Sequence, residues 1–303
     1  MFKTGVFFSS CAICSSRDVS IVNTYKHYWR VCNSCGNAFS QNKAFYPLSF
    51  LPFAQLQKNR VVQEDISNTY VFAEYSDEKR RQDEAQAEQL SSEWIKLHGI
   101  DFSGKKIIEI SGGTGYFINA FRKYGATVFH TEINFKDVEH ARDKLQLDSR
   151  QFDFTKNRLS DVFSEKFDVI LFKGALEFCV NIKDMLAGLE ANVLRGTKII
   201  VMTCVPTLGN FLITQFDEYN QQVLYQKETL VDYFDESGYF LVSAQDVGDT
   251  RNVYPLAYYR NKWSRPLMFR YMIPAMYRLS PDTRFLFHSL SVRGLHLIFQ
   301  KEK

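Results

Sequence analysis

Four of the six cysteines in this 303-residue chain form two closely spaced pairs near its N-terminus. Cys11 and Cys14 make one Cys-x-x-Cys knuckle, and Cys32 and Cys35 make a second knuckle 17 residues later. Each knuckle can present two thiolates to one tetrahedral ion, and this spacing is typical of four-cysteine zinc sites. A redox dithiol, the alternative, normally uses one such pair at the start of a helix. The pattern predicts a structural Zn²⁺ with no open coordination position.

A glycine-rich turn in residues 107–117 (IIEISGGTGYF) is the second stretch that could do chemistry. An apolar strand ends in a turn that opens a helix, which lets the backbone approach a ligand closely. The dinucleotide pattern Gly-x-Gly-x-x-Gly does not fit, because Gly113 and Gly115 lack the third glycine. Glu109 stands inside the strand end. Glu132 ends the next strand, where a carboxylate can accept both hydroxyls of a ribose.

This Glu-x-Ser-Gly-Gly-Thr-Gly segment resembles the Asp/Glu-x-Gly-x-Gly-x-Gly loop of class I S-adenosylmethionine-dependent methyltransferases. The resemblance implies an enzyme, a methyltransferase with S-adenosylmethionine as its cofactor. Gly113 and Gly115 would line the amino-acid end of the cofactor. Glu109 would order the loop, and Glu132 would hold the ribose. Asp153 matches the acidic position that meets the adenine amine in the family.

Two positions depart from the family pattern. Ser111 replaces the first glycine of the loop, and Glu177-Phe178 stands where the family often has a Glu-His pair. An acceptor hydroxyl, such as that of a sugar, is a poor acid, and it needs a nearby base if it is to attack the sulfonium methyl of the cofactor. Glu177, at the mouth of the fourth expected strand, is the candidate catalytic residue. None of the six histidines is assigned this role.

A further resemblance concerns the order of the parts. A four-cysteine ribbon, then residues 70–76 (YVFAEYS), then the glycine-loop domain is similar to sugar methyltransferases that act on nucleotide-linked deoxysugars. In those relatives, aromatic residues before the main domain close over cofactor and acceptor, and Tyr70 and Tyr75 are the matching candidates. The resemblance implies a small-molecule or glycan acceptor, namely a sugar that is nucleotide-linked or part of a surface polysaccharide.

Two other functions remain open. The first is RNA or protein methylation with the ribbon as a docking module. A basic, aromatic C-terminal stretch favours nucleic acid, but residues 173–176 (KGAL) lack the Asn/Asp-Pro-Pro-aromatic segment that grips an amino group. Nucleic acid is therefore the less favoured acceptor. The second is a non-catalytic protein that binds S-adenosylmethionine as a regulator, which a test for methyl transfer would distinguish.

The elements that must position these residues alternate along the chain. Strand patterns occupy residues 106–110, 127–131, 167–172, 198–203 and 239–243. Helical patterns occupy residues 116–124, 135–145, 182–193 and 227–237. This alternation predicts a Rossmann-like, doubly wound α/β fold with a mostly parallel sheet covered on both faces. Ligands bind such sheets at the carboxyl ends of the strands.

Three regions are expected from the chain order. Residues 1–45 form a zinc ribbon, residues 46–98 a linker and helical lead-in, and residues 99–303 the methyltransferase domain. The tail strand 295–299 is expected to form an antiparallel hairpin with 239–243 and to lie beside the fifth strand. Residues 249–292 then form a lid-like insertion, whose arginines would meet a phosphate or pyrophosphate on the acceptor (Arg260, Arg265 and Arg270).

Composition limits the setting of the protein. Hydrophobic residues make up 45% of the chain, which is enough for a core, and no apolar run approaches 18 residues. We therefore expect a cytoplasmic protein without a transmembrane segment. The net charge of +3 hides basic ends, since residues 1–60 hold seven basic and one acidic residue and residues 251–303 hold ten and two. A peripheral membrane helix at 266–279 is the alternative use of this charge, although Pro274 interrupts it.

Overall fold

The computed structural model describes residues 10–11, 13–23, 27–42, 77–206, 223–247 and 294–302. The chain divides into two compact units. The first comprises residues 1–47, 203–230 and 244–296. The second comprises residues 48–202, 231–243 and 297–303. Each unit therefore draws on segments that lie far apart in the sequence.

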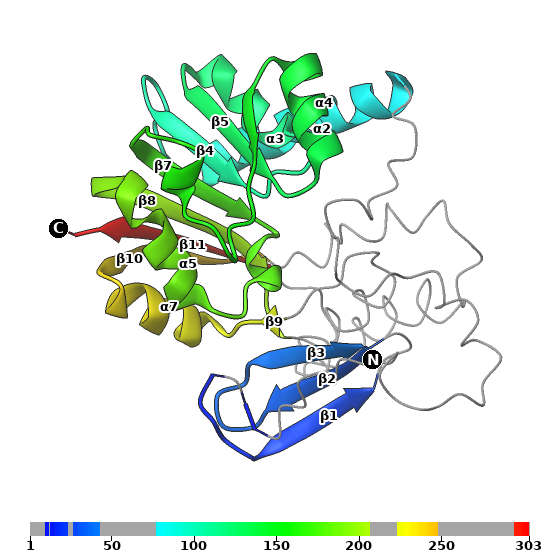
Figure 1. Ribbon diagram of the computed structural model, residues 1–303, viewed down its shortest axis with the longest axis vertical. Coiled ribbons are helices and arrows are strands. Elements are labelled where there is room, and N and C mark those ends of the chain that lie inside the picture. Colours follow the sequence, from blue (N-terminus) through cyan, green and yellow to red (C-terminus); the bar gives the residue numbers. More distant parts are fainter. Residues whose placement is uncertain are drawn as a thin grey trace, which may run out of the picture. The chain divides into compact units, whose positions relative to one another are not determined.

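A seven-stranded sheet forms the centre of the glycine-loop domain (Figure 1). The pairings from β8 through β7, β4 and β5 to β6 are all parallel. β11 lies between β10 and β8, which confirms the predicted place of the tail strand. In spatial order the strands are β10 (Tyr239–Val247), β11 (Gly294–Lys301), β8 (Val193–Cys204), β7 (Phe167–Lys173), β4 (Lys106–Ile110), β5 (Thr127–Glu132) and β6 (Asp148–Gln151). The predicted doubly wound, mostly parallel α/β fold is confirmed.

Helices cover both faces of this sheet. α2 (Asp77–His98), α3 (Tyr116–Asn119) and α4 (Phe135–Leu145) form one layer, in which α3 contacts both of the others. α5 (Ile182–Leu189) and α7 (Lys227–Glu236) lie on the other side (Figure 1). Parallel strands buried on both faces need such cover, because their side chains point alternately to either face.

The core follows this alternation. On β4, Ile107 packs toward the layer of α2, α3 and α4, in a cluster with Trp94 and Phe121. The next residue, Ile108, is also fully buried but points to the opposite face. There, aromatic side chains meet edge to face, including Phe129 and Phe167 with ring centroids 5.2 Å apart. The sheet that carries the glycine loop is therefore held between two apolar layers.

Two predicted helices are shorter than expected. The helix that starts at Tyr116 continues only to Asn119 and passes into a 3₁₀ turn that ends at Tyr124, before Gly125 with a φ of 80°. The second ends at Leu189, also followed by a 3₁₀ turn, and β8 begins at Val193. Asn192 in this turn donates hydrogen bonds to two backbone carbonyls, each at 2.8 Å, which fixes where the chain turns into the strand.

The N-terminal ribbon is an antiparallel sheet in the first unit. Its strands in spatial order are β1 (Val19–Asn23), β2 (His27–Cys32), β3 (Ala38–Asn42) and β9 (Val223–Leu224). Trp29, Ala38 and Leu224 form its buried core. β2 ends at Cys32, the first cysteine of the second knuckle. β9 was not predicted, because two apolar residues carry no periodic signal.

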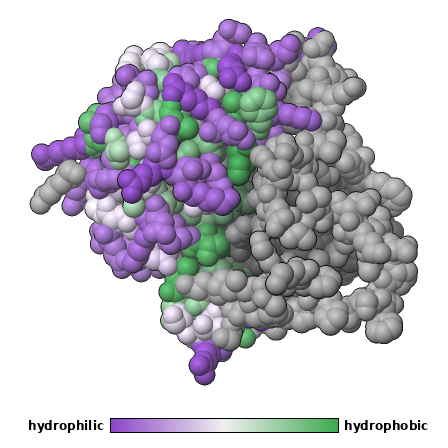
Figure 2. Space-filling model, viewed as in Figure 1, coloured by the Kyte–Doolittle hydropathy of each residue, from purple (hydrophilic) through white to green (hydrophobic). Residues whose placement is uncertain are grey.

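The face shown in Figure 2 is mostly hydrophilic, with some scattered apolar residues and a hydrophobic band in the lower centre of the view. Among the exposed apolar residues, Leu97 and Phe135 are each about half exposed. Single exposed apolar residues are ordinary on protein surfaces. No helix in the described part of the chain is both long enough and apolar enough to cross a membrane.

Candidate functional site

The glycine loop leaves β4 with three residues in the left-handed conformation. Ser111, Gly113 and Gly115 have φ values of 55°, 57° and 81°. Glycine adopts this conformation without steric cost, whereas other residues rarely do. Ser111 thus keeps the backbone conformation of a glycine at the position where it replaces the family's glycine. Gly115 is then the N-cap of α3, so the loop ends at the start of a helix.

The three glycines of the loop differ in the space around them. A Cβ built on Gly113 would have no atom within 4 Å, whereas one on Gly112 or Gly115 would lie under 3.0 Å from a neighbouring side chain. Gly113 therefore borders open space, as a residue that lines a ligand must. Its position agrees with the predicted role, which remains a prediction.

We expect Gly113→Val to abolish binding of S-adenosylhomocysteine, because a branched side chain would lie where the protein backbone must approach the cofactor closely. Gly104→Val is the matched control. Gly104 also has a positive φ (68°) and open space around its Cβ position, but it precedes the opposite end of the same strand. Calorimetry should give no heat of binding for the first variant and near-normal affinity for the second. Equal losses in both would show that backbone strain, and not the site, is responsible.

Glu132 is fixed to this loop at the end of β5. One carboxylate oxygen accepts a hydrogen bond from the N–H of Gly113 at 3.0 Å. The other accepts from Ile133 at 2.7 Å and from Asn134 at 3.1 Å. The side chain is only 8% exposed, and this burial raises its pKa while the three N–H groups oppose the rise. Glu132 therefore orders the turn, and its predicted role in binding the ribose remains a prediction.

Glu109 is fully buried one strand away, on β4. Burial raises its pKa from the ordinary 4.5 to about 7, although the nearby charge of Lys173 and a hydrogen bond with the backbone of Ile118 both lower it. A carboxyl group in such surroundings favours the protonated, neutral form.

The burial of Glu109 predicts how the stability of the protein depends on pH. A carboxyl whose pKa is raised in the folded state stabilises the protein below its unfolded pKa and loses that contribution as the pH rises. Relative to Glu109→Gln, the wild-type protein should lose stability on the order of 3 kcal/mol between pH 4.5 and 7, and nothing further above pH 7. Urea unfolding at a series of pH values measures this difference. Glu139→Gln, at an exposed position on α4, is the control and should leave the curve unchanged; parallel curves for Glu109→Gln would contradict the prediction.

A buried histidine, not assigned from the sequence, lies beside these acids. His130 of β5 is 0% exposed, and its Nδ1 lies 2.8 Å from the hydroxyl of Ser149 on β6. Burial lowers the pKa of His130 to about 4, so the ring is neutral at physiological pH. A lone histidine in a strand pattern gave no signal of this pairing, because the partner comes from a strand that was itself not predicted.

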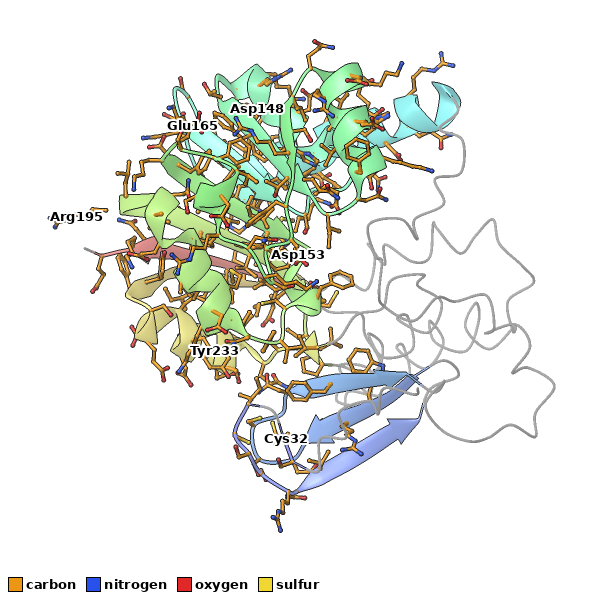
Figure 3. All side chains as sticks on the ribbon, in the orientation of Figure 1. Cys32, Asp148, Asp153, Glu165, Arg195 and Tyr233 are labelled. Carbon is orange, nitrogen blue, oxygen red and sulfur yellow. The ribbon has the colours of Figure 1, made fainter. Side chains whose placement is uncertain are left out.

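Asp153 follows β6 and lies toward the carboxyl ends of the strands, whereas Asp148 lies at the start of the same strand (Figure 3). The Asp153 carboxylate accepts from the N–H and hydroxyl of Thr155, at 3.0 and 2.6 Å, and pairs with Lys156 at 2.8 Å. Although burial opposes it, these partners lower the pKa of Asp153. The acid is charged and ordered before any adenine amine reaches it.

The remaining predicted residues are placed only in part. Glu177 lies in a 3₁₀ turn directly after β7 and is 1% exposed. Its position at the carboxyl end of the strand is as expected, but its role as base stays a prediction. Tyr70, Tyr75 and the insertion 249–292 with its three arginines lie outside the described residues.

The four cysteines of the ribbon come together as predicted (Cys32 is labelled in Figure 3). Their sulfur atoms all lie within 4.8 Å of one another, with Cys11 to Cys35 at 3.6 Å and Cys14 to Cys32 at 3.5 Å. A tetrahedral ion with Zn–S bonds of 2.3 Å separates its sulfurs by roughly 3.8 Å. Gly36, directly after the second knuckle, is in the left-handed conformation, with a φ of 70°. The donor set and its spacing fit Zn²⁺.

Asn37 is a residue of this centre that the sequence did not indicate. It is fully buried, and its amide N–H₂ group donates to the sulfur of Cys35 at 3.0 Å and to the hydroxyl of Thr229 at 2.7 Å. Its carbonyl accepts from the N–H of Gln226 at 2.8 Å. Hydrogen bonds of this kind orient metal ligands. Asn37 therefore ties the cysteine cluster to the segment that follows β9.

Comparisons with known proteins define the class. A family model described as a methyltransferase domain matches residues 79–244. A comparison with curated protein sequences gave no match. Among solved structures, the cyclase SpnF has 16% identity and a TM-score of 0.50, and the match covers 71% of this chain and 81% of SpnF.

Two other solved structures are similar. Phosphoethanolamine N-methyltransferase 2 of Haemonchus contortus, in complex with phosphomonomethylethanolamine and S-adenosylhomocysteine, has 11% identity and a TM-score of 0.50, over 71% of this chain and 53% of that one. Magnesium protoporphyrin IX methyltransferase of Synechocystis PCC 6803 has 12% identity and a TM-score of 0.47, over 74% and 85%. At these identities, the likeness to the two structures with a TM-score of 0.50 shows the fold alone.

The strand order and the glycine loop define the Rossmann-like fold of class I methyltransferases. The chain belongs to the methyltransferase-domain family, and it is an S-adenosylmethionine-dependent methyltransferase.

Proposed function

We propose that the enzyme binds S-adenosylmethionine over the glycine loop and transfers its methyl group to a sugar. One observation supports this cofactor site most directly: the buried carboxylate of Glu132 accepts a hydrogen bond from the N–H of Gly113, the glycine that borders open space. Gly113 and Gly115 would lie against the amino-acid end of the cofactor. Glu109 would support the loop from below, and Asp153 would accept from the adenine amine. Tyr75 would close over the cofactor.

Methyl transfer needs an acceptor atom aligned with the sulfonium methyl, together with a base that removes its proton. Glu177 is the proposed base because it follows β7, at the end of the sheet where ligands bind in this fold. It is almost fully buried, so an acceptor would meet it inside the site and not at the surface.

The metal centre has a structural role in this proposal. The four thiolates of the ribbon would hold one Zn²⁺ in a closed tetrahedral site, which has no position for a substrate. Support comes from the distances between the sulfurs and from the hydrogen bond that Asn37 donates to Cys35. The ion would stabilise the ribbon sheet and take no part in the reaction.

A sugar acceptor is supported by the order of the parts, since a four-cysteine ribbon before this domain resembles sugar methyltransferases. The test is incubation of the zinc-loaded enzyme with radiolabelled S-adenosylmethionine and four acceptor pools: nucleotide sugars, surface glycans, RNA and protein. We expect label in nucleotide sugars or glycans. Label in RNA or protein would contradict a sugar acceptor and would support the alternative, in which the ribbon docks an RNA or protein substrate. Binding of the cofactor without label in any pool would contradict methyl transfer to these acceptors.

A further inference from the structure

Three buried polar side chains form a row across neighbouring strands beneath the glycine loop. Glu109 on β4 pairs in register with His130 on β5, and His130 pairs in register with Ser149 on β6. Residues that pair in register point to the same face, here the layer of α2, α3 and α4. Their exposed fractions are 0%, 0% and 4%. A row of this kind inside an apolar layer needs a reason, because burying polar groups is costly.

The row touches the loop at Gly112. A Cβ on this residue would lie 2.7 Å from Cδ2 and 2.8 Å from Nε2 of His130, and 2.8 Å from a carboxylate oxygen of Glu109. Gly112 is not among the residues with positive φ, so its backbone would accept another residue. Glycine is therefore required here by the imidazole and the carboxyl below it. This differs from Gly113, where the conformation requires glycine and the space is open.

The orientation of the imidazole is fixed from the far side. Nδ1 lies 2.8 Å from the Ser149 hydroxyl. The other side of the ring faces the loop, where the backbone of Gly112 and Gly113 raises the pKa of His130 against the effect of burial. The loop is also held from β5, because the N–H of Gly112 donates to the carbonyl of Thr131 at 2.9 Å. The backbone of Gly112 therefore lies between β5 and the imidazole of His130, whose orientation Ser149 fixes.

We propose that His130, held by Ser149, is a positioning residue that sets the height of the glycine loop for the cofactor. Its ring fills the space beneath Gly112, and this places Gly113 where Glu132 accepts its N–H and where the cofactor would lie. The proposal rests on the cofactor site proposed above. His130 contacts neither the cofactor nor the acceptor in this role and acts through the loop.

A double-mutant cycle tests the contact, with S-adenosylhomocysteine as the probe and calorimetry on the full, zinc-loaded chain. Gly112→Ala should weaken binding at least 30-fold, because the new methyl group collides with the ring. His130→Ala should weaken it about tenfold, because the loop loses its support. The double variant should bind at least fivefold more tightly than Gly112→Ala alone, since it removes the ring and leaves only the carboxylate oxygen of Glu109 close to the new methyl group. Coupling of this kind between residues in contact is what such cycles measure.

Val128→Ala is the matched control. Val128 lies two residues before His130 on the same face of β5 and is 5% exposed, so its truncation also leaves a void, but the atoms nearest to a Cβ at Gly112 belong to His130 and Glu109. It should not restore binding to Gly112→Ala. Should Gly112→Ala fail to fold, the His130→Ala background should restore a cooperative urea transition, and the Val128→Ala background should not.

Ser149 provides a second, independent readout. Ser149→Ala should weaken binding of S-adenosylhomocysteine about fivefold, and Ser149→Thr, which keeps the hydroxyl, should recover most of the loss. A double variant that binds no better than Gly112→Ala, or Ser149→Ala with unchanged affinity, overturns the proposal while the cofactor site stands. Wild-type protein that binds no S-adenosylhomocysteine contradicts the cofactor site, and the positioning role with it.

Discussion

Glu132→Ala should lower the affinity for S-adenosylhomocysteine by two to three orders of magnitude. The variant loses the predicted bonds to the ribose and also leaves three backbone N–H groups without their acceptor, including that of Gly113. Each bond to a charged acceptor contributes about 1.5–3 kcal/mol, so the loss of two such bonds is enough for this effect. Isothermal titration calorimetry measures it directly.

Two further variants test whether the loss of affinity comes from the carboxylate of Glu132. Glu132→Gln keeps one acceptor oxygen and should lose less affinity than Glu132→Ala. Glu139→Ala removes an exposed acid from α4 and should leave the affinity unchanged. An affinity for Glu132→Ala within threefold of wild type would mean that the cofactor lies elsewhere.

Cys11→Ser should cost the protein its zinc and unfold the ribbon sheet. The energy of ion binding supplies much of the folding energy of such small modules. Among the described residues, the core of the ribbon consists of three buried side chains with two partly buried ones packed against them. We expect about one zinc per chain in the wild-type protein by metal analysis and under half an equivalent in the variant. Cys179→Ser, outside the four-cysteine cluster, should keep the full amount. Zinc content that is equal in wild type and Cys11→Ser would refute the site.

Much of the sheet could be predicted because its strands are apolar on both faces. β4 and β7 each contain four consecutive buried residues, and β8 contains three, at positions 199–201, as is typical of parallel strands covered on both faces. β6 escaped prediction because its sequence, DSRQ, is polar; it is the last strand of the sheet and has a neighbour on one side only. Edge strands need no apolar pattern on both faces.

The site was predictable where a motif is local. The two cysteine knuckles and the glycine turn are each contained in a few residues, and the structure brings the four sulfurs together. Contacts between distant segments carried no such signal. The bond from Gly113 to Glu132 and the pairing of His130 with Ser149 depend on strand register, which sequence periodicity does not give. Asn37 likewise gains its role from Thr229, 192 positions away.

The strand β9 has a consequence for how the chain is made. The ribbon is synthesised first, but its fourth strand pairs Phe39 with Val223, and the Asn37 hydrogen bonds need residues 226 and 229. At about 5–20 residues per second, a ribosome needs roughly 10–40 s to add the intervening residues. During that interval the ribbon has the four cysteines of its cluster but not β9 or the residues that bond to Asn37. The proposed Zn²⁺ would therefore be able to bind all four thiolates before the ribbon sheet is complete.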